Sequence, residues 1–219
     1  MTLQGTAVHF NVGGIYIDAE IALPQAAIGL VLFVHGSGSS RHSPRNQFVA
    51  EQLRARGLGT VLMDLLTSSE ERADQFSGHL RFNIPFLAAR VTTVVDDLRV
   101  QTTLPFGLFG ASTGAAAALV VAGGRPKEIS AVVSRGGRPD LAGDAALSKV
   151  VAPTLLIVGG DDHDVVALNG EAMARMKAEV RREIVPGASH LFHEPGALET
   201  VAHLAADWFT RYLDVAHMT

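Results

Sequence analysis

The chain has 219 residues, 47% of them hydrophobic and 18% charged, which is typical of a globular protein and excludes a disordered or fibrous one. Its formal net charge is −4 and no run of five or more basic residues occurs, so neither nucleic acid nor an anionic membrane is an expected partner. Cysteine is absent, which excludes disulfides, thiolate nucleophiles and cysteine-based zinc sites and fits a reducing cytosol.

Neither a targeting segment nor a membrane span is evident. Residues 1–10 lack a basic segment followed by an apolar stretch, and no window approaches the roughly 18 consecutive apolar residues that a span needs. No repeat and no Pro-rich or Ser-rich linker divides the chain. We therefore expect a cytoplasmic protein whose residues 1–219 form a single domain.

Short apolar runs bounded by Gly, Pro and Asp predict eight strands. The first two are separated by Gly13-Gly14, which indicates an antiparallel hairpin. The later runs are mostly apolar on both faces and alternate with helix-length segments, as in a parallel sheet covered on both sides. We expect strands at 6–12, 15–23, 29–34, 59–64, 106–109, 129–134, 154–158 and 182–185, and helices at 45–56, 84–101, 113–122, 169–180 and 195–213.

One polar and charged segment, 67–83, interrupts this alternation. It fits a surface loop or a small lid over a cleft, and it is too short for a separate cap domain. The sequence therefore predicts an α/β fold with a mostly parallel eight-stranded sheet, helices on both faces and no large cap domain.

The candidate nucleophile is Ser112, in the run Gly110-Ala111-Ser112-Thr113-Gly114, which fits the pattern G-x-S-x-G. The run lies between an expected strand and an expected helix, where a tight turn strains the serine backbone and requires small residues on either side. A bare pattern of this kind also occurs as an ordinary glycine turn with the serine as a helix N-cap. The strand end places Ser112 at the carboxyl edge of the sheet, where open α/β folds bind ligands.

A serine hydroxyl needs a base, and the base needs an acid that fixes its tautomer. His190 is the preferred base because it lies in a small-residue loop between the last expected strand and the last helix, and His193 is the alternative. Asp162 is the preferred acid, after the strand at 154–158, with Asp164 as runner-up and Asp161 third. The chain order Ser, Asp, His is that of the α/β-hydrolase triad.

The carboxylates and histidines of this region also suggest a different class of site, a metal centre. No H-E-x-x-H or H-x-x-E-H pattern occurs, and a metal would leave the serine turn unexplained. We therefore expect no metal.

Acyl transfer requires donors for the developing oxyanion. One expected donor is the backbone N–H of Thr113, directly after the nucleophile, and the second is that of Ser37 or, as an alternative, Gly38. The loop after the strand at 29–34 lacks the lysine of a phosphate-binding P-loop, so a nucleotide is not expected. His35 is expected to hold this loop through its ring nitrogens.

Taken together, the His35-Gly36 loop, the turn at 110–114, the turn at 160–162 and the His190 loop resemble the α/β-hydrolase superfamily, and in particular its small dienelactone-hydrolase-like members, over nearly the whole chain. The resemblance implies a serine hydrolase that needs no cofactor and cleaves a small-molecule ester, lactone or thioester through an acyl-enzyme. Dienelactone hydrolases have a cysteine where this chain has Ser112, so the resemblance does not extend to dienelactone as substrate.

Arginines flank the expected mouth of the site, in the segments 40–46 and 134–138. Arg41 and Arg135 are candidates for binding a substrate carboxylate, although arginines in surface loops are commonly just solvated. The alternative to an enzyme is a non-catalytic binding or scaffold protein that keeps the fold with an inactive site.

Overall fold

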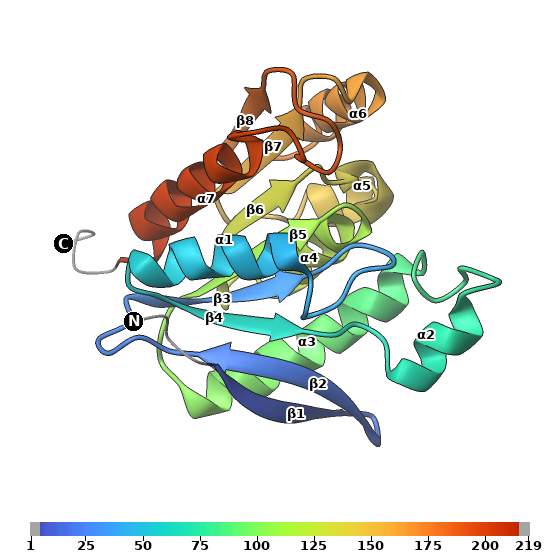
Figure 1. Cartoon of the computed structure of the whole chain (residues 1–219), viewed down its shortest axis with the longest axis vertical. Helices are drawn as coiled ribbons and strands as arrows, with labels where there is room; N and C mark the ends of the chain where they lie inside the picture. Colours follow the sequence, from blue (N-terminus) through green and yellow to red (C-terminus); the bar gives the residue numbers. More distant parts are fainter. Residues whose placement is uncertain (1–4, 215–219) are drawn as a thin grey trace.

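A computed structural model describes residues 5–214, and they are built around one eight-stranded sheet in the order β1-β2-β4-β3-β5-β6-β7-β8 (Figure 1). β1 and β2 form an antiparallel hairpin, β2 pairs antiparallel with β4, and the strands from β4 to β8 are parallel neighbours. The predicted mostly parallel α/β fold is confirmed. The strands are Thr6–Val12 (β1), Ile15–Ala22 (β2), Gly29–Val34 (β3), Leu58–Met63 (β4), Phe106–Ala111 (β5), Ile129–Arg135 (β6), Thr154–Gly159 (β7) and Val180–Val185 (β8).

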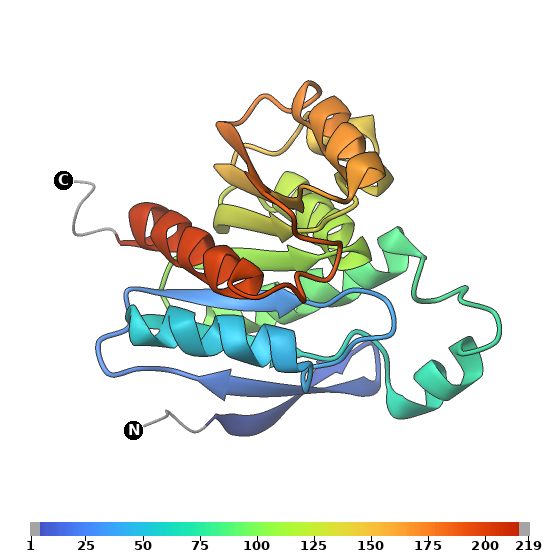
Figure 2. The same cartoon turned by 45° about the horizontal axis from the view of Figure 1, so that its top comes forward.

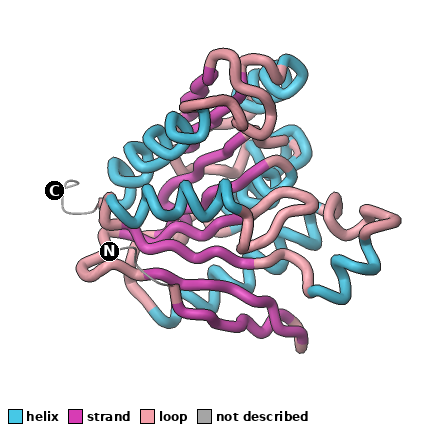
Figure 3. The backbone as a smooth tube through the Cα atoms, viewed as in Figure 1, coloured by secondary structure: helices cyan, strands magenta, loops and turns pink. Residues whose placement is uncertain are grey.

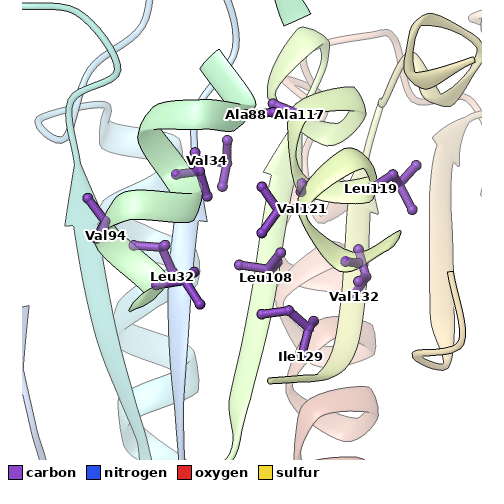
Figure 4. Packing of buried hydrophobic residues seen from close by; sticks show 14 of the residues in the cluster. Leu32, Val34, Ala88, Val94, Leu108, Ala117, Leu119, Val121, Ile129 and Val132 are labelled. Atoms are coloured by element: carbon purple, nitrogen blue, oxygen red, sulfur yellow. The ribbon is translucent and has the colours of Figure 1, made fainter. Parts of the chain in front are cut away.

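Helices cover both faces of this sheet (Figures 2 and 3). α1 and α7 pack on one face and share a buried cluster with alternate strand residues. α3 and α4 pack on the other face, where Val94 and Val121 lie over Leu32, Leu108 and Val132 of three neighbouring strands (Figure 4). The helices are Pro44–Ala55 (α1), Ser68–Asp74 (α2), Ile84–Gln101 (α3), Thr113–Gly124 (α4), Asp144–Leu147 (α5), His163–Met173 (α6) and Ala197–Leu213 (α7), with a 3-10 turn at Pro139–Ala142.

The helix expected at 169–180 is misplaced, because α6 begins at His163 and ends at Met173. Its inward face is formed by Val165, Asn169 and Ala172, so the apolar period starts directly after Asp162. Carboxylates near a helix N-terminus are stabilised by the helix dipole, and Asp164 lies in the first turn of α6. The helix therefore starts directly after Asp162 and not at residue 169.

The polar segment 67–83 contains α2, whose N-terminus has a capping box between Thr67 and Glu70. Glu70 also forms two hydrogen bonds, of 2.7 and 2.6 Å, with the buried guanidinium of Arg90 on α3. Although desolvation raises the pKa of the buried Asp74, hydrogen bonds from Arg81 and Leu80 lower it to about 2. The segment is thus an anchored structure beyond the carboxyl ends of β3 and β4 (Figure 1).

The turn from β5 into α4 brings helix and strand backbones unusually close together. A Cβ atom at Gly114 would lie 2.1 Å from the carbonyl oxygen of Val34 and 2.3 Å from that of His35. A Cβ atom at Gly110 would lie 2.4 Å from the Cα of Ala115. Glycine is therefore required on both sides of Ser112, as the sequence predicts.

His35 fastens the loop after β3 to the segment after β4. Its Nε2 accepts a hydrogen bond of 3.0 Å from the N–H of Leu65, so the ring proton is on Nδ1, which lies 2.8 Å from the carbonyl oxygen of Gly36. Burial lowers the pKa of His35, against the opposing effect of the Gly36 carbonyl. The expectation that His35 holds this loop through both ring nitrogens is confirmed.

Gly114→Ala is expected to lower the free energy of unfolding by about 3 kcal/mol, since the new methyl group meets backbone atoms that cannot move independently. The matched control is Gly124→Ala at the other end of α4, where a Cβ has open space. Alanine there should be neutral or stabilising by about 0.5–1 kcal/mol. Chemical denaturation of both variants checks this, and equal stabilities would contradict the packing argument.

The free energy of unfolding should fall as the pH is lowered below about 6.5, the ordinary pKa of histidine, because the unfolded chain takes up a proton that folded His35 excludes. The contribution of neutral His35 to the free energy of unfolding is fully present above that pH. It is lost progressively as the pH falls toward the lowered pKa of His35 in the folded state. Denaturation curves are measured between about pH 7.5 and about pH 5, the range in which histidine titrates. The free energy of unfolding should decline less steeply with falling pH in His35→Gln than in the wild type. His42→Gln, an exposed histidine of the same loop, is the control and should retain the wild-type slope.

Candidate active site

Ser112 occupies a strained backbone conformation at the tip of the turn between β5 and α4, with φ 50° and ψ −122°. A non-glycine residue in such a region costs about 1–3 kcal/mol and persists only where its surroundings enforce it. Here the Ser112 carbonyl accepts hydrogen bonds of 3.1 Å from the N–H groups of Ala115 and Arg138. The Ser112 N–H donates to the carbonyl of Arg135 at 3.3 Å, so β6 and the segment after it hold the turn.

His190 and Asp162 lie side by side, with His190 Nδ1 2.6 Å from the Oδ2 of Asp162. Because a carboxylate only accepts, the imidazole carries its proton on Nδ1, and Nε2 is left as the acceptor. Backbone hydrogen bonds join the two loops, from Gly160 N–H to the Val185 carbonyl and from Asp161 N–H to the Ala188 carbonyl. The pairing of the loops after β7 and β8 therefore sets the position of this histidine and its carboxylate.

The alternative carboxylates and the alternative histidine lie elsewhere. Asp161, Asp164 and His193 are exposed, and within residues 5–214 none of their side chains has a hydrogen-bond partner. Of the three neighbouring aspartates, Asp162 is thus the one that the structure brings to His190.

Two residues that the sequence analysis missed shape the His190 loop. Glu194 accepts a hydrogen bond of 3.0 Å from the N–H of Ser189, and hydrogen bonding from Ser189 lowers the pKa of Glu194. Phe192 is 2% exposed and has φ 54°, a conformation that is uncommon for a bulky residue. The loop is therefore anchored in the core by Phe192 and closed on itself by the carboxylate of Glu194.

Ser112 and His190 line one pocket of about 200 Å³ at the carboxyl edge of the sheet. Within the described range, neither Ser112 Oγ nor His190 Nε2 has a hydrogen-bond partner. The pocket wall is completed by Gly36, Ser37, Ser39, Arg45, Ala111, Arg135 and Leu191. The structure thus gathers the loops after β3 and β8, the ends of β5 and β6, the turn after β5 and the start of α1 around one space.

The two expected oxyanion donors are adjacent. Thr113 is the first residue of α4, so its N–H has no acceptor within the helix and lies at the positive end of the helix dipole. The Ser37 N–H donates to the Thr113 side-chain Oγ1 at 3.1 Å. The threonine hydroxyl therefore occupies the second expected donor and links the loop after β3 to the serine turn.

The two arginines singled out in the sequence lie in different surroundings. Arg41 pairs with Asp64 and, at 3.4 Å, with Asp18, and it does not line the pocket. The charge of Arg41 is thus neutralised by Asp18 of β2 and by Asp64, which directly follows β4.

Arg135 does line the pocket and is 7% exposed. Burial and then the nearby charge of Arg45 lower the pKa of Arg135 to about 10.

Arg45 also lines the pocket, so of the two arginines in the segment 40–46 it is Arg45, and not the preferred candidate Arg41, that reaches the site. It follows Pro44 in the first turn of α1, where the helix dipole disfavours a positive charge.

Neither a metal centre nor a membrane span is found among residues 5–214. That range holds no group of three or more His, Cys, Asp or Glu side chains placed to bind a metal ion. None of its helices is both long and apolar enough to cross a membrane.

Comparison with solved structures finds relatives that share this fold. The crystal structure of a dienelactone hydrolase from Anabaena variabilis is 52% identical, covers 97% of this chain and 100% of that chain, and has a TM-score of 0.94. Est1E from Butyrivibrio proteoclasticus has a TM-score of 0.79 at 15% identity, over 94% of this chain and 98% of its own, which shows the shared fold alone.

A curated relative from Mycobacterium tuberculosis, provisionally named a phosphoribosyl transferase, is 50% identical over 214 residues, which are 96% of this chain and 47% of that protein. The chain therefore spans about half the length of the curated relatives that it matches. No protein-family model matches the chain. The fold, the order of the motifs and the full-length match at 52% identity agree, and the chain belongs to the dienelactone-hydrolase-like members of the α/β-hydrolase superfamily.

Proposed function

We propose that this protein is a serine hydrolase that cleaves a carboxylic ester, lactone or thioester through an acyl-enzyme formed on Ser112. The observation that carries the proposal is the 2.6 Å hydrogen bond between Asp162 and His190, at a pocket that the strained Ser112 also lines. Membership of a family of hydrolases supports the same reaction class.

In the first half of the reaction, Ser112 Oγ attacks the carbonyl carbon while His190 Nε2 takes the hydroxyl proton. The Asp162 carboxylate stabilises the imidazolium that results and keeps Nε2 directed to the pocket. His190 then gives the proton to the leaving oxygen or sulfur as the bond to the acyl carbon breaks. In unliganded enzymes the serine–histidine hydrogen bond is often long and tightens when substrate binds.

In the second half, a water molecule attacks the acyl carbon and His190 Nε2 accepts its proton. His190 then returns the proton to Ser112 Oγ as the bond between Oγ and the acyl carbon breaks, and the carboxylic acid is released. Each tetrahedral intermediate carries a negative oxygen, for which the N–H groups of Thr113 and Ser37 are the proposed donors. Removal of a single donor of this kind costs about 2.7–4 kcal/mol of transition-state stabilisation in other enzymes. Since Ser37 N–H now donates to Thr113 Oγ1, the oxyanion has to share or replace that hydroxyl.

The name of the curated relatives applies to proteins about twice as long as this chain. The proposed hydrolase site uses residues of the matched part alone. A non-catalytic binding protein with the same fold is the second candidate, and labelling of the serine by a fluorophosphonate separates it from an enzyme.

Ser112→Ala should lower kcat for a p-nitrophenyl acyl ester by about 10⁴ to 10⁶ and abolish labelling by a fluorophosphonate, because the nucleophile is lost. The matched control is Ser39→Ala, a second serine of the same pocket outside the turn. It should label as the wild type does. Undiminished labelling of Ser112→Ala would show that the nucleophile is another residue, and absence of labelling in the wild type would favour the binding protein.

Asp162→Asn should lower kcat by about 10⁴ with little change in KM, because the amide favours the wrong histidine tautomer. Asp161→Asn and Asp164→Asn are the controls, since both side chains are exposed. They should retain wild-type kcat in the same steady-state assay. A loss in either control as large as that in Asp162→Asn would show that the acid is misassigned.

A further inference from the structure

The pocket beside Ser112 holds two guanidinium groups without a carboxylate partner. Within residues 5–214, no carboxylate oxygen lies within 4.0 Å of the Arg45 or the Arg135 side chain. The Nη1 of Arg135 and the Nε of Arg45 are buried and have no hydrogen-bond acceptor. Several other arginines are paired with a carboxylate, as in Arg41–Asp64, Arg90–Glu70, Arg125–Asp96 and Arg138–Asp140. Arg54 also has a buried Nε without a hydrogen-bond partner, but its Nη1 donates to Thr60 and it does not line this pocket.

These two groups concentrate positive charge at one wall of the pocket. Arg135 remains protonated near neutral pH, even though burial and the repulsion by Arg45 lower its pKa to about 10. α1 adds to this charge, because its first turn contains Arg45 and no acidic residue, and its dipole is positive at that end. Glu71 lines the adjoining hollow beside Arg45, although it forms no ion pair with it.

Arg135 is buried and Arg45 is partly buried. A guanidinium removed from water without a counter-charge is costly, so this pair points to an anion that binds between them. We propose that Arg45 and Arg135 bind the phosphate of a phosphate monoester, carried by the same substrate whose acyl group is transferred to Ser112. This inference rests on the proposed hydrolase function for the reaction and on the arginines for the anion.

The charge balance favours a phosphate over a single carboxylate. A phosphate monoester carries close to two negative charges at neutral pH and offers three oxygens, so it can neutralise both guanidinium groups at once. A single carboxylate would leave one of the two positive charges unbalanced. Because both arginines and Ser112 line the same pocket of about 200 Å³, the phosphate and the scissile carbonyl belong to one small molecule.

The test measures binding of inorganic phosphate and phenyl phosphate to Ser112→Ala protein by isothermal titration calorimetry, with acetate and malonate as comparison anions. Both phosphates should bind saturably and more tightly than acetate or malonate. Adding Arg45→Met or Arg135→Met should weaken binding by about 10- to 100-fold, as expected for the loss of charge-assisted hydrogen bonds. Arg135→Lys, which keeps the charge, should weaken it less.

Arg125→Met is the matched control, because Arg125 is paired with Asp96 on the surface and should leave phosphate binding unchanged. Thermal melting of each variant establishes that it is folded, and Arg45→Met provides a second test should Arg135→Met not fold. Phosphate binding that is absent, or that is unaffected by substitution of either pocket arginine, would overturn the inference. Acetate binding as tight as phosphate, or tighter binding of malonate, would assign the site to carboxylates instead.

The same measurements keep the two proposals apart. Calorimetry on Ser112→Ala protein reports the anion site without any catalysis. Fluorophosphonate labelling of the wild type reports the nucleophile without any phosphate. Phosphate binding that depends on Arg45 and Arg135 supports the anion site even where labelling fails, and labelling with no phosphate binding overturns the anion site alone.

Discussion

The close approach of α4 to β3 and β5 is the constraint on which the site depends. Gly114 lets the first turn of α4 lie against the carbonyls of Val34 and His35, and Gly110 lets it lie against the end of β5. Ser112 is thereby held at φ 50°, in a strained turn whose carbonyl and N–H are bound to the end of β6 and the residues after it. The energy of the surrounding packing maintains a conformation that an isolated chain would avoid.

The same contacts bring the remaining parts of the pocket together. The hydrogen bonds between Ser112 and the end of β6 place Arg135 at the serine turn, and His35 and Thr113 fix the loop that carries Ser37. On the far side, the paired loops after β7 and β8 present His190 with Asp162 behind it. A parallel sheet gathers these loops at one edge, because each strand ends on the same side.

Much of this was predictable because the strands are short, apolar runs between turn residues, and because two glycines around a serine at a strand end indicate a tight turn into a helix. The eight strands, the glycine requirement at the turn and the role of His35 followed from such local signals. For the whole chain 1–219, the single domain and the cytoplasmic location stay predictions, as do the catalytic roles of Ser112, Asp162 and His190.

The predictions from sequence are wrong or incomplete where tertiary contacts determine the position of a helix or a side chain. α6 starts at His163 and not at residue 169, with Asp164 in its first turn, where the helix dipole stabilises a carboxylate. Arg41 and Arg45 are four residues apart in one loop and helix start, and only the fold determines that Asp64 and Asp18 neutralise the first while the second enters the pocket. Glu194 supports the His190 loop through a backbone hydrogen bond that leaves no pattern in the sequence.

The central claim is that Ser112 is the nucleophile, and mass spectrometry of fluorophosphonate-treated wild-type protein tests it most directly. Trypsin releases residues 100–127 as one peptide, because Pro126 follows Arg125, and Ser112 is the one serine in it. We predict that the adduct is found on this peptide and that fragmentation assigns it to Ser112. A stoichiometric adduct on any other peptide would contradict the account.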